Sequence, residues 1–198
     1  MQTKNIAFVA ILTAACIGIQ LTPRPPNVEF TTFIVFMIGV WAGTAVGILS
    51  AAAVMCVNGF LSPWGYAGMN LPFQVAGAFV AALIGGFYGH HLPRGKSVQF
   101  CFETSVLGAL IALAYDIATN FGFAMWQIVS GIDFGTALAV TAIGGALFSA
   151  VHVVSNAIIF GAFFVPLAKV YGNYFLKGGK KIKSCAPFRV WGKRRISK

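Results

Sequence analysis

Charged residues are scarce in this sequence of 198 residues, and acidic ones are nearly missing. Only 9% of the residues are charged, and the whole chain has four Asp or Glu and three His. With 58% hydrophobic residues and a mean hydropathy of +0.82, the chain has too much apolar surface to bury inside a water-soluble globule. The composition therefore excludes a soluble domain and predicts an integral membrane protein.

Catalytic and metal-binding motifs are also missing. The sequence has no HExxH, no GxSxG, no Walker A loop and no carboxylate pair at helical spacing. The four cysteines, Cys16, Cys56, Cys101 and Cys185, show no CxxC spacing, so neither a disulfide framework nor a metal site is expected. Because acid–base catalysis has so few candidates, we expect a protein that is not an enzyme and that holds no cofactor.

The net charge of +10 is concentrated at one end of the chain. Nine of the fourteen Lys and Arg residues follow residue 176. A basic segment beside a membrane domain is typical of a cytoplasmic end that lies against anionic lipid headgroups. This distribution disfavours nucleic acid as a partner, and it divides the chain into a membrane domain, residues 1–176, and a basic cytoplasmic tail, residues 177–198.

The topology depends on the apolar segment 30–57. Other apolar runs indicate helices over about residues 5–21, 73–89, 98–119 and 136–168. If 30–57 were one helix, Lys4 would lie opposite the basic loop 90–96 and the tail. If it breaks near residues 41–47, where Gly39, Gly43 and Gly47 permit a tight turn, all basic segments share one side. The predicted fold is therefore an all-α integral membrane bundle of six transmembrane helices with both termini cytoplasmic.

Three connections then fall on the outer side, over residues 22–33, 58–72 and 118–135. They are rich in aromatic and amide residues and nearly free of basic ones. Since loops carry recognition while a helical scaffold positions them, the connections suggest a binding cup. Trp64, Tyr66 and Trp126 would equally suit an aromatic belt at the membrane interface. Asp116 and Asn120 lie one helical turn apart and face the cup.

Several polar or small residues have both a structural and a functional interpretation. Glu29 could serve the N-terminus of the second helix or bind a ligand. Ala10 and Ala14, four residues apart, allow close approach of another helix, either within the bundle or from a partner. The mid-helix residues His152, Ser155 and Asn156 are interpreted as an interhelical hydrogen-bond cluster, with a ligand or proton site as the alternative. Two further patterns are a small-residue face (Gly77, Ala81, Gly85, Gly89) and a kink or helix end at Pro166.

Three features together define a resemblance. They are the proline-led loop PNVEFTT at 26–32, the glycine-spaced second and third helices, and FLSPWG at 60–65 followed by PFQVAGAFVAALIGG at 72–86. With six helices over residues 5–175, the chain resembles the substrate-binding S components of energy-coupling factor (ECF) transporters. These proteins capture vitamins and related micronutrients.

The resemblance implies partners and site residues. Ala10 and Ala14 match the AxxxA motif by which S components contact the membrane T component. The assembly would also contain two ATPase subunits that use ATP, in a prokaryotic plasma membrane, and the loaded S component would topple to face inward. Substrate would lie between outer loops and outer helix ends, which selects eight residues by position: Asn27, Glu29, Asn58, Trp64, Gln74, Asp116, Asn120 and Trp126.

Two other function classes stay open on the sequence. One is a stand-alone channel or secondary carrier of small solutes, although the bilayer centre is almost uncharged and no internal repeat is evident. The other is a membrane enzyme or assembly factor. The substrate itself is a vitamin-like small molecule for which the sequence carries no recognised subfamily signature.

Overall fold

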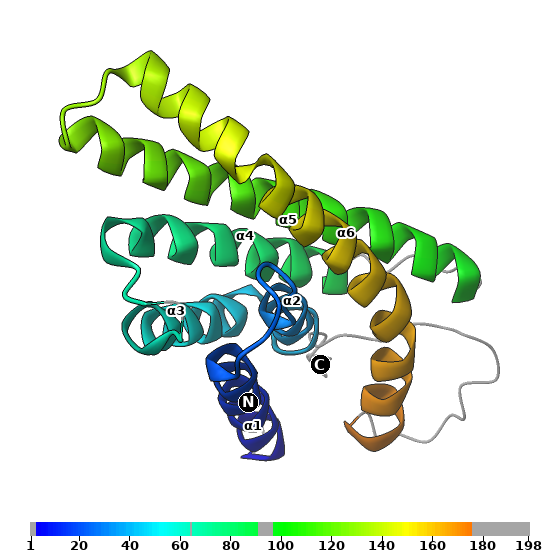
Figure 1. The fold of residues 1–198 in the computed structure, drawn as a ribbon. Coiled ribbons are helices and arrows are strands. Elements are labelled where there is room, and N and C mark those ends of the chain that lie inside the picture. The colour runs from blue at the N-terminus through cyan, green and yellow to red at the C-terminus, as the bar shows by residue number, and fades with distance from the viewer. Residues whose placement is uncertain (1–2, 64, 91–96, 176–198) are drawn as a thin grey trace, which may run out of the picture.

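The computed structural model describes residues 3–63, 65–90 and 97–175, and these form only helices and short connections (Figure 1). Four helical segments are long and apolar enough to cross a membrane, and two further apolar helices are shorter. The chain is therefore a multi-pass helical membrane protein. The helices are α1 (Thr3–Leu21), α2 (Thr31–Ala42), α3 (Thr44–Leu61), the 3-10 helix η1 (Gly68–Asn70), α4 (Leu71–His90), α5 (Ser97–Val129) and α6 (Phe134–Phe175).

The predicted break in segment 30–57 is confirmed. α2 ends at Ala42 and α3 begins at Thr44, so Gly43 alone separates the two helices. Gly43 has φ +89° and ψ 164°, a backbone region that is essentially open only to glycine. The two helices then pack so closely that a Cβ on Gly47 would lie 3.1 Å from the Cα atom of Gly39. The glycine spacing thus serves both the turn and the close contact.

Replacing Gly43 with alanine is expected to lower the free energy of unfolding by about 1–3 kcal/mol, because the turn would hold a Cβ in a strained conformation. The measurement is equilibrium unfolding in detergent micelles. Gly144→Ala is the control, since Gly144 has no positive φ and a Cβ there meets nothing within 4 Å. Equal stability of the two variants would contradict the assignment of strain to Gly43.

α2 forms the centre of the bundle. Nine of its 12 residues are buried, so other helices rather than lipid surround it. Its length of about 18 Å is less than the roughly 30 Å of a bilayer core, which is tolerated because protein covers it. α4 crosses α2 through the predicted small-residue face: a Cβ on Gly89 would lie 2.5 Å from the carbonyl oxygen of Val40. The close-packing role of this face is confirmed.

The predicted outer loop at 118–135 is wrong. α5 continues to Val129 and α6 begins at Phe134, so only residues 130–133 connect them. The two helices form a long hairpin that extends beyond the other helices at the 118–134 end (Figure 1). Polar residues that suggested a loop instead join the two helices, since Gln127 Nε2 donates a 2.8 Å hydrogen bond to Thr141 Oγ1. Pro166 lies inside α6, which continues to Phe175, so the helix does not end there. α6 curves along its C-terminal part (Figure 1).

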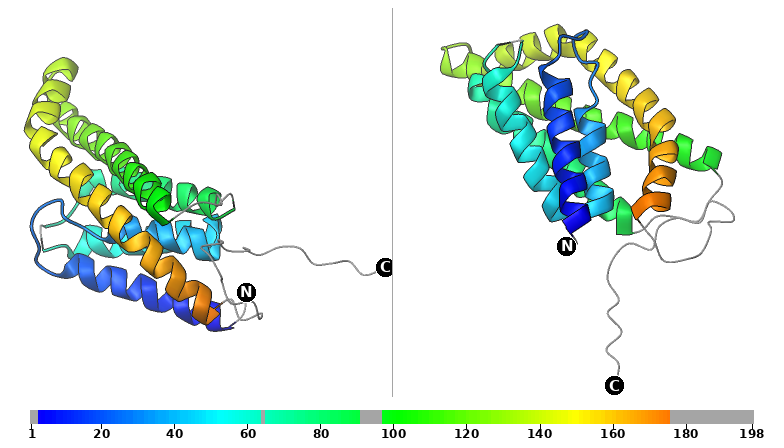
Figure 2. Two further views of the ribbon diagram at one scale, coloured as in Figure 1. Left: turned by 90° about the vertical axis from the view of Figure 1, so that its right-hand side faces the viewer. Right: turned by 90° about the horizontal axis from the view of Figure 1, so that it is seen from below.

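The start of α1 and the end of α6 lie at the same end of the bundle (Figure 2). Tyr171 of α6 stacks on Trp41 of α2 with ring centroids 4.8 Å apart, and its ring centroid lies 5.5 Å from that of Phe8 in α1. This proximity agrees with an even number of crossings, while the membrane side of this end stays a prediction. The basic loop at 91–96 and the tail at 177–198 lie outside the described residues.

Candidate functional site

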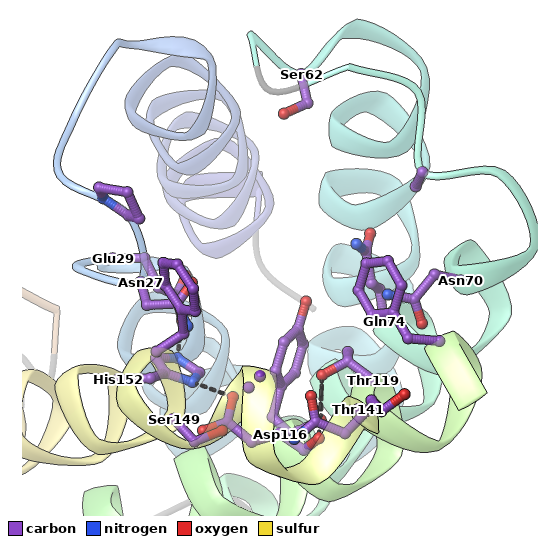
Figure 3. Close-up of a pocket in the computed structure, with 18 of the residues that line it drawn as sticks. Asn27, Glu29, Ser62, Asn70, Gln74, Asp116, Thr119, Thr141, Ser149 and His152 are labelled. Carbon is purple, nitrogen blue, oxygen red and sulfur yellow. Dashed lines mark hydrogen bonds and ion pairs between the residues drawn. The ribbon is translucent and has the colours of Figure 1, made fainter. Parts of the chain in front are cut away.

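A cavity of about 680 Å³ opens at one end of the bundle (Figure 3). Its lining includes Gln20 near the end of α1, so it lies far along that helix from Phe8 and its neighbour Tyr171. Its walls come from the connection between α1 and α2, from the end of α3 and residues 62, 65–67 and 70, and from the facing sides of α4, α5 and α6. Its size falls within the range of about 300–1,000 Å³ that is usual for small-molecule sites. Segments far apart in the sequence therefore meet around one space.

Six of the eight residues selected from the sequence line this cavity. They are Asn27, Glu29, Asn58, Gln74, Asp116 and Asn120. Trp126 does not: it lies on α5 with 53% of its surface exposed, because the expected loop is helical and turns this side chain outward. Trp64 lies outside the described residues. The structure thus brings together the polar candidates from four separate segments.

His152 forms the centre of the charged part of the cavity. Its Nδ1 lies 2.7 Å from Oδ1 of Asp116 on α5, and its Nε2 lies 3.2 Å from Oε1 of Glu29 in the connection before α2. All three residues are buried, with 3%, 5% and 8% of their surfaces exposed for His152, Asp116 and Glu29. One imidazole therefore bridges two carboxylates from different parts of the chain.

The bridge indicates the protonation state of His152. A neutral imidazole has one N–H donor, whereas the imidazolium ion has two. Because both ring nitrogens face carboxylate oxygens, only the imidazolium ion donates to both Asp116 and Glu29. The predicted interhelical hydrogen bonding of His152 is present, and the same side chain also lines the cavity.

Glu29 also orders the first turn of α2. It accepts hydrogen bonds from the backbone N–H groups of Thr31 at 2.9 Å and Thr32 at 3.3 Å, and from the hydroxyl of Thr32. Burial by itself would raise the pKa of Glu29, but the hydrogen bonds from His152, Thr31 and Thr32 and the imidazolium charge lower it, to about 2. The Glu29 carboxylate thus caps the N-terminus of α2 and also lines the cavity.

The connection before α2 is held by a second network that sequence reasoning missed. The Arg24 guanidinium donates to the backbone oxygen and to the side-chain Oε1 of Gln20, both at 2.6 Å. Gln20 Oε1 also accepts a 2.7 Å hydrogen bond from Thr31 Oγ1. Arg24 is the one basic residue in the three predicted outer connections, and this isolation could have marked it as a structural or binding residue.

Further cavity residues on α5 and α6 were also missed. Tyr115 and Thr119 flank Asp116, while Thr141 and Ser149 precede His152. Ser149 and His152 are three residues apart, and Thr141 lies two turns before Ser149, so all three share one face of α6. The sequence already predicted a helix over about residues 136–168, so this spacing was the available signal for the three residues.

Four buried side-chain oxygens in the cavity wall have no hydrogen-bond partner among the described residues. They are Oδ1 of Asn58, Oδ1 of Asn70, Oε1 of Gln74 and Oδ2 of Asp116. A buried polar atom without a partner costs about 1–3 kcal/mol, so such atoms are few in folded proteins. Their concentration around one cavity marks it as the candidate binding site of the described bundle.

Comparisons with protein-family models, with curated proteins and with solved structures found no match for this chain. The chemistry of the cavity is therefore the basis for assigning a function. That chemistry comprises two buried carboxylates, a bridging histidine, and amide side chains from α1, α3, η1, α4 and α5.

Proposed function

We propose that this protein captures a small polar molecule in the cavity and delivers it to partner proteins, as the S component of an ECF-type importer does. The observation that carries the proposal is the cavity with its Glu29–His152–Asp116 bridge. Ionisable groups within a membrane domain are costly, and they mark substrate or ion sites by default. The rest of the described bundle offers no comparable group of charges around a cavity.

In the proposed orientation the chain crosses the membrane six times with both termini in the cytoplasm. The cavity then opens outward, because it lies opposite the end where α1 begins and α6 finishes. The positive-inside distribution of Lys and Arg supports this orientation. A vitamin-like substrate would enter from outside, and ATP would be used by the partner subunits alone.

The small residues of α1 support docking on a partner. Ala10 and Ala14 are exposed, as are Ala7 and Gly18 on nearly the same stripe, so the other described helices leave this face of α1 uncovered. A Cβ on Gly18 would meet nothing within 4 Å. Small side chains leave the helix backbone open to close approach by another helix in lipid. We assign this face to the T component.

Replacing Ala10 or Ala14 with tryptophan is expected to leave ligand binding unchanged and to reduce uptake by about tenfold or more, because the bulky ring prevents close helix contact. Uptake is measured in cells that contain the T and ATPase subunits, and binding is measured on the purified chain. The control is Ile158→Trp, which places the same ring at a 64% exposed position on α6. Normal uptake by both alanine variants would refute the docking assignment.

The stand-alone carrier is the second candidate, and the His152 bridge is the observation that favours it. A histidine between two carboxylates is a usual component of proton relays in transporters. The purified chain in liposomes distinguishes the two functions. Accumulation of solute driven by a proton gradient, without ATPase partners, would establish the carrier and reject the S component.

A further inference from the structure

We propose that the cavity binds an organic cation with several N–H donors, such as an amidinium, and that binding releases the proton held by His152. Because capture of a ligand is itself a proposed function, this assignment of the ligand class rests on it. The assignment follows from three properties of the cavity: its unpaired acceptors, its engaged donors and its charge balance.

The unpaired atoms of the cavity wall are acceptors. Asp116 uses Oδ1 for His152 and leaves Oδ2 without a partner among the described residues. The buried amide oxygens of Asn58, Asn70 and Gln74 also have no hydrogen-bond partner among the described residues. A ligand that presents several N–H groups would pair with these oxygens, and a carboxylate gives the strongest such bond to a cationic donor. A ligand rich in acceptors would leave all four unpaired.

Several side-chain donors around the cavity already have partners among the described residues. Both terminal nitrogens of Arg24 bond to Gln20, and the amide nitrogen of Gln127 bonds to Thr141. The hydroxyl of Thr119 donates to backbone oxygens of its own helix. An anionic ligand that used these groups would have to break their contacts, whereas an N–H donor would leave them in place. The buried atoms of the described cavity wall that lack a partner are all acceptors, so the pattern favours a ligand that donates hydrogen bonds.

The charges in the cavity balance only when His152 is protonated. The two cations His152 and Arg24 then face the two carboxylates Glu29 and Asp116. A bound cation would add an uncompensated positive charge in a region of low dielectric constant, and loss of the His152 proton would restore neutrality. The titratable or charged groups that line the cavity are Arg24 and Glu29 before α2, Tyr66 before η1, Tyr115 and Asp116 on α5, and His152 on α6.

Aromatic side chains complete a site for a flat cation. Tyr115 contacts His152 edge-on, with ring centroids 5.6 Å apart, and it lines the cavity beside Asp116. Phe123 and Phe148 line the cavity from α5 and α6. A cation over an aromatic face gains electrostatic stabilisation, more so when water is excluded. The ring positions thus agree with the ligand class that the acceptors select.

The test compares three molecules of nearly the same shape and different charge. Benzamidine is a cation with N–H donors, benzamide is neutral, and benzoate is an anion. Binding to the full chain in phosphatidylcholine nanodiscs is measured by calorimetry in two buffers of different ionisation enthalpy. We expect benzamidine to bind about tenfold or more tightly than the other two, with release of about one proton per ligand. Tighter binding of benzoate or benzamide, or no proton release, would overturn the proposal.

Two variants locate the effect. Asp116→Asn is expected to weaken benzamidine binding by about tenfold or more, because the charge-assisted bond is lost. Asp133→Asn is the matched control: Asp133 lies in the connection between α5 and α6, is exposed and does not line the cavity, so binding should be unchanged. His152→Gln should abolish proton release. If the cavity variants fail to fold, the comparison of the three molecules on the native chain decides by itself.

The outcomes also separate the ligand class from the capture function. Preference for benzoate or benzamide would refute the cation and leave capture intact. Failure of all three to bind at about 10 mM, a concentration that detects even weak millimolar affinity, would refute the ligand class. Binding of benzamidine by a chain that supports no uptake with T and ATPase partners would refute the importer and leave the ligand class intact.

Discussion

Replacing His152 with alanine is expected to lower the free energy of unfolding by about 3–5 kcal/mol, one of the largest effects of any single substitution in the described bundle. The imidazole bridges Asp116 and Glu29 at 2.7 and 3.2 Å, and both carboxylates are buried. Without it, two negative charges from different segments would face each other with no cation between them. The measurement is equilibrium unfolding of the purified chain in mixed micelles.

Neutralising the carboxylates provides the control for this prediction. In a chain that carries Glu29→Gln and Asp116→Asn, His152→Ala should cost only about 1–2 kcal/mol, since no buried charge is left unpaired. The two costs thus differ if repulsion between carboxylates causes the loss. An equal cost in both backgrounds would show that His152 contributes by packing alone.

Replacing Gly39 with alanine is expected to destabilise the bundle by about 1–3 kcal/mol, and by more if α2 and α4 separate. A Cβ at this position would lie 2.6 Å from the carbonyl oxygen of Ala82 and 3.0 Å from the backbone nitrogen of Gly86. Both neighbours are backbone atoms, so no side-chain rotation relieves the overlap. Unfolding in micelles and the yield of folded protein measure the effect.

The matched control is the same substitution at Gly18, where a Cβ meets nothing within 4 Å on the exposed face of α1. Alanine there should leave stability unchanged or raise it by up to about 1 kcal/mol, because alanine is the better helix former. If Gly39→Ala were as stable as Gly18→Ala, close contact between the backbones of α2 and α4 would not be what holds the centre of the bundle.

The sequence predicted the architecture where the signal was local. Apolar run lengths gave the helices, and the charge distribution required segment 30–57 to double back, which it does at Gly43. The spacing of Gly85 and Gly89 indicated the close-packing face of α4. Each of these depends on a physical property of a short stretch of chain, such as the access of glycine to positive φ.

The prediction of a loop at 118–135 was wrong because tertiary contacts allow polar residues to lie on a membrane helix that lines a cavity. Asn120 and Gln127 belong to the segment 118–135, which was interpreted as a loop rich in aromatic and amide residues. In the structure they lie on α5 and line a cavity, so the helix continues to Val129. Trp126 was predicted to line the cavity from the loop, but on the helix its side chain lies on the exposed face. Periodicity alone does not tell a cavity-lining face from a solvent-exposed loop.

By itself the sequence determined a multi-pass helical membrane protein with a turn at Gly43 and a few acidic residues placed in or beside its helices, because hydropathy, charge and glycine spacing act over short distances along the chain. Only the tertiary structure decided that Glu29, Asp116 and His152 meet. They are separated by 36 to 123 residues in the pairs that bond. Such a contact depends on how α5 and α6 pack against the start of α2, and no local pattern encodes that distance.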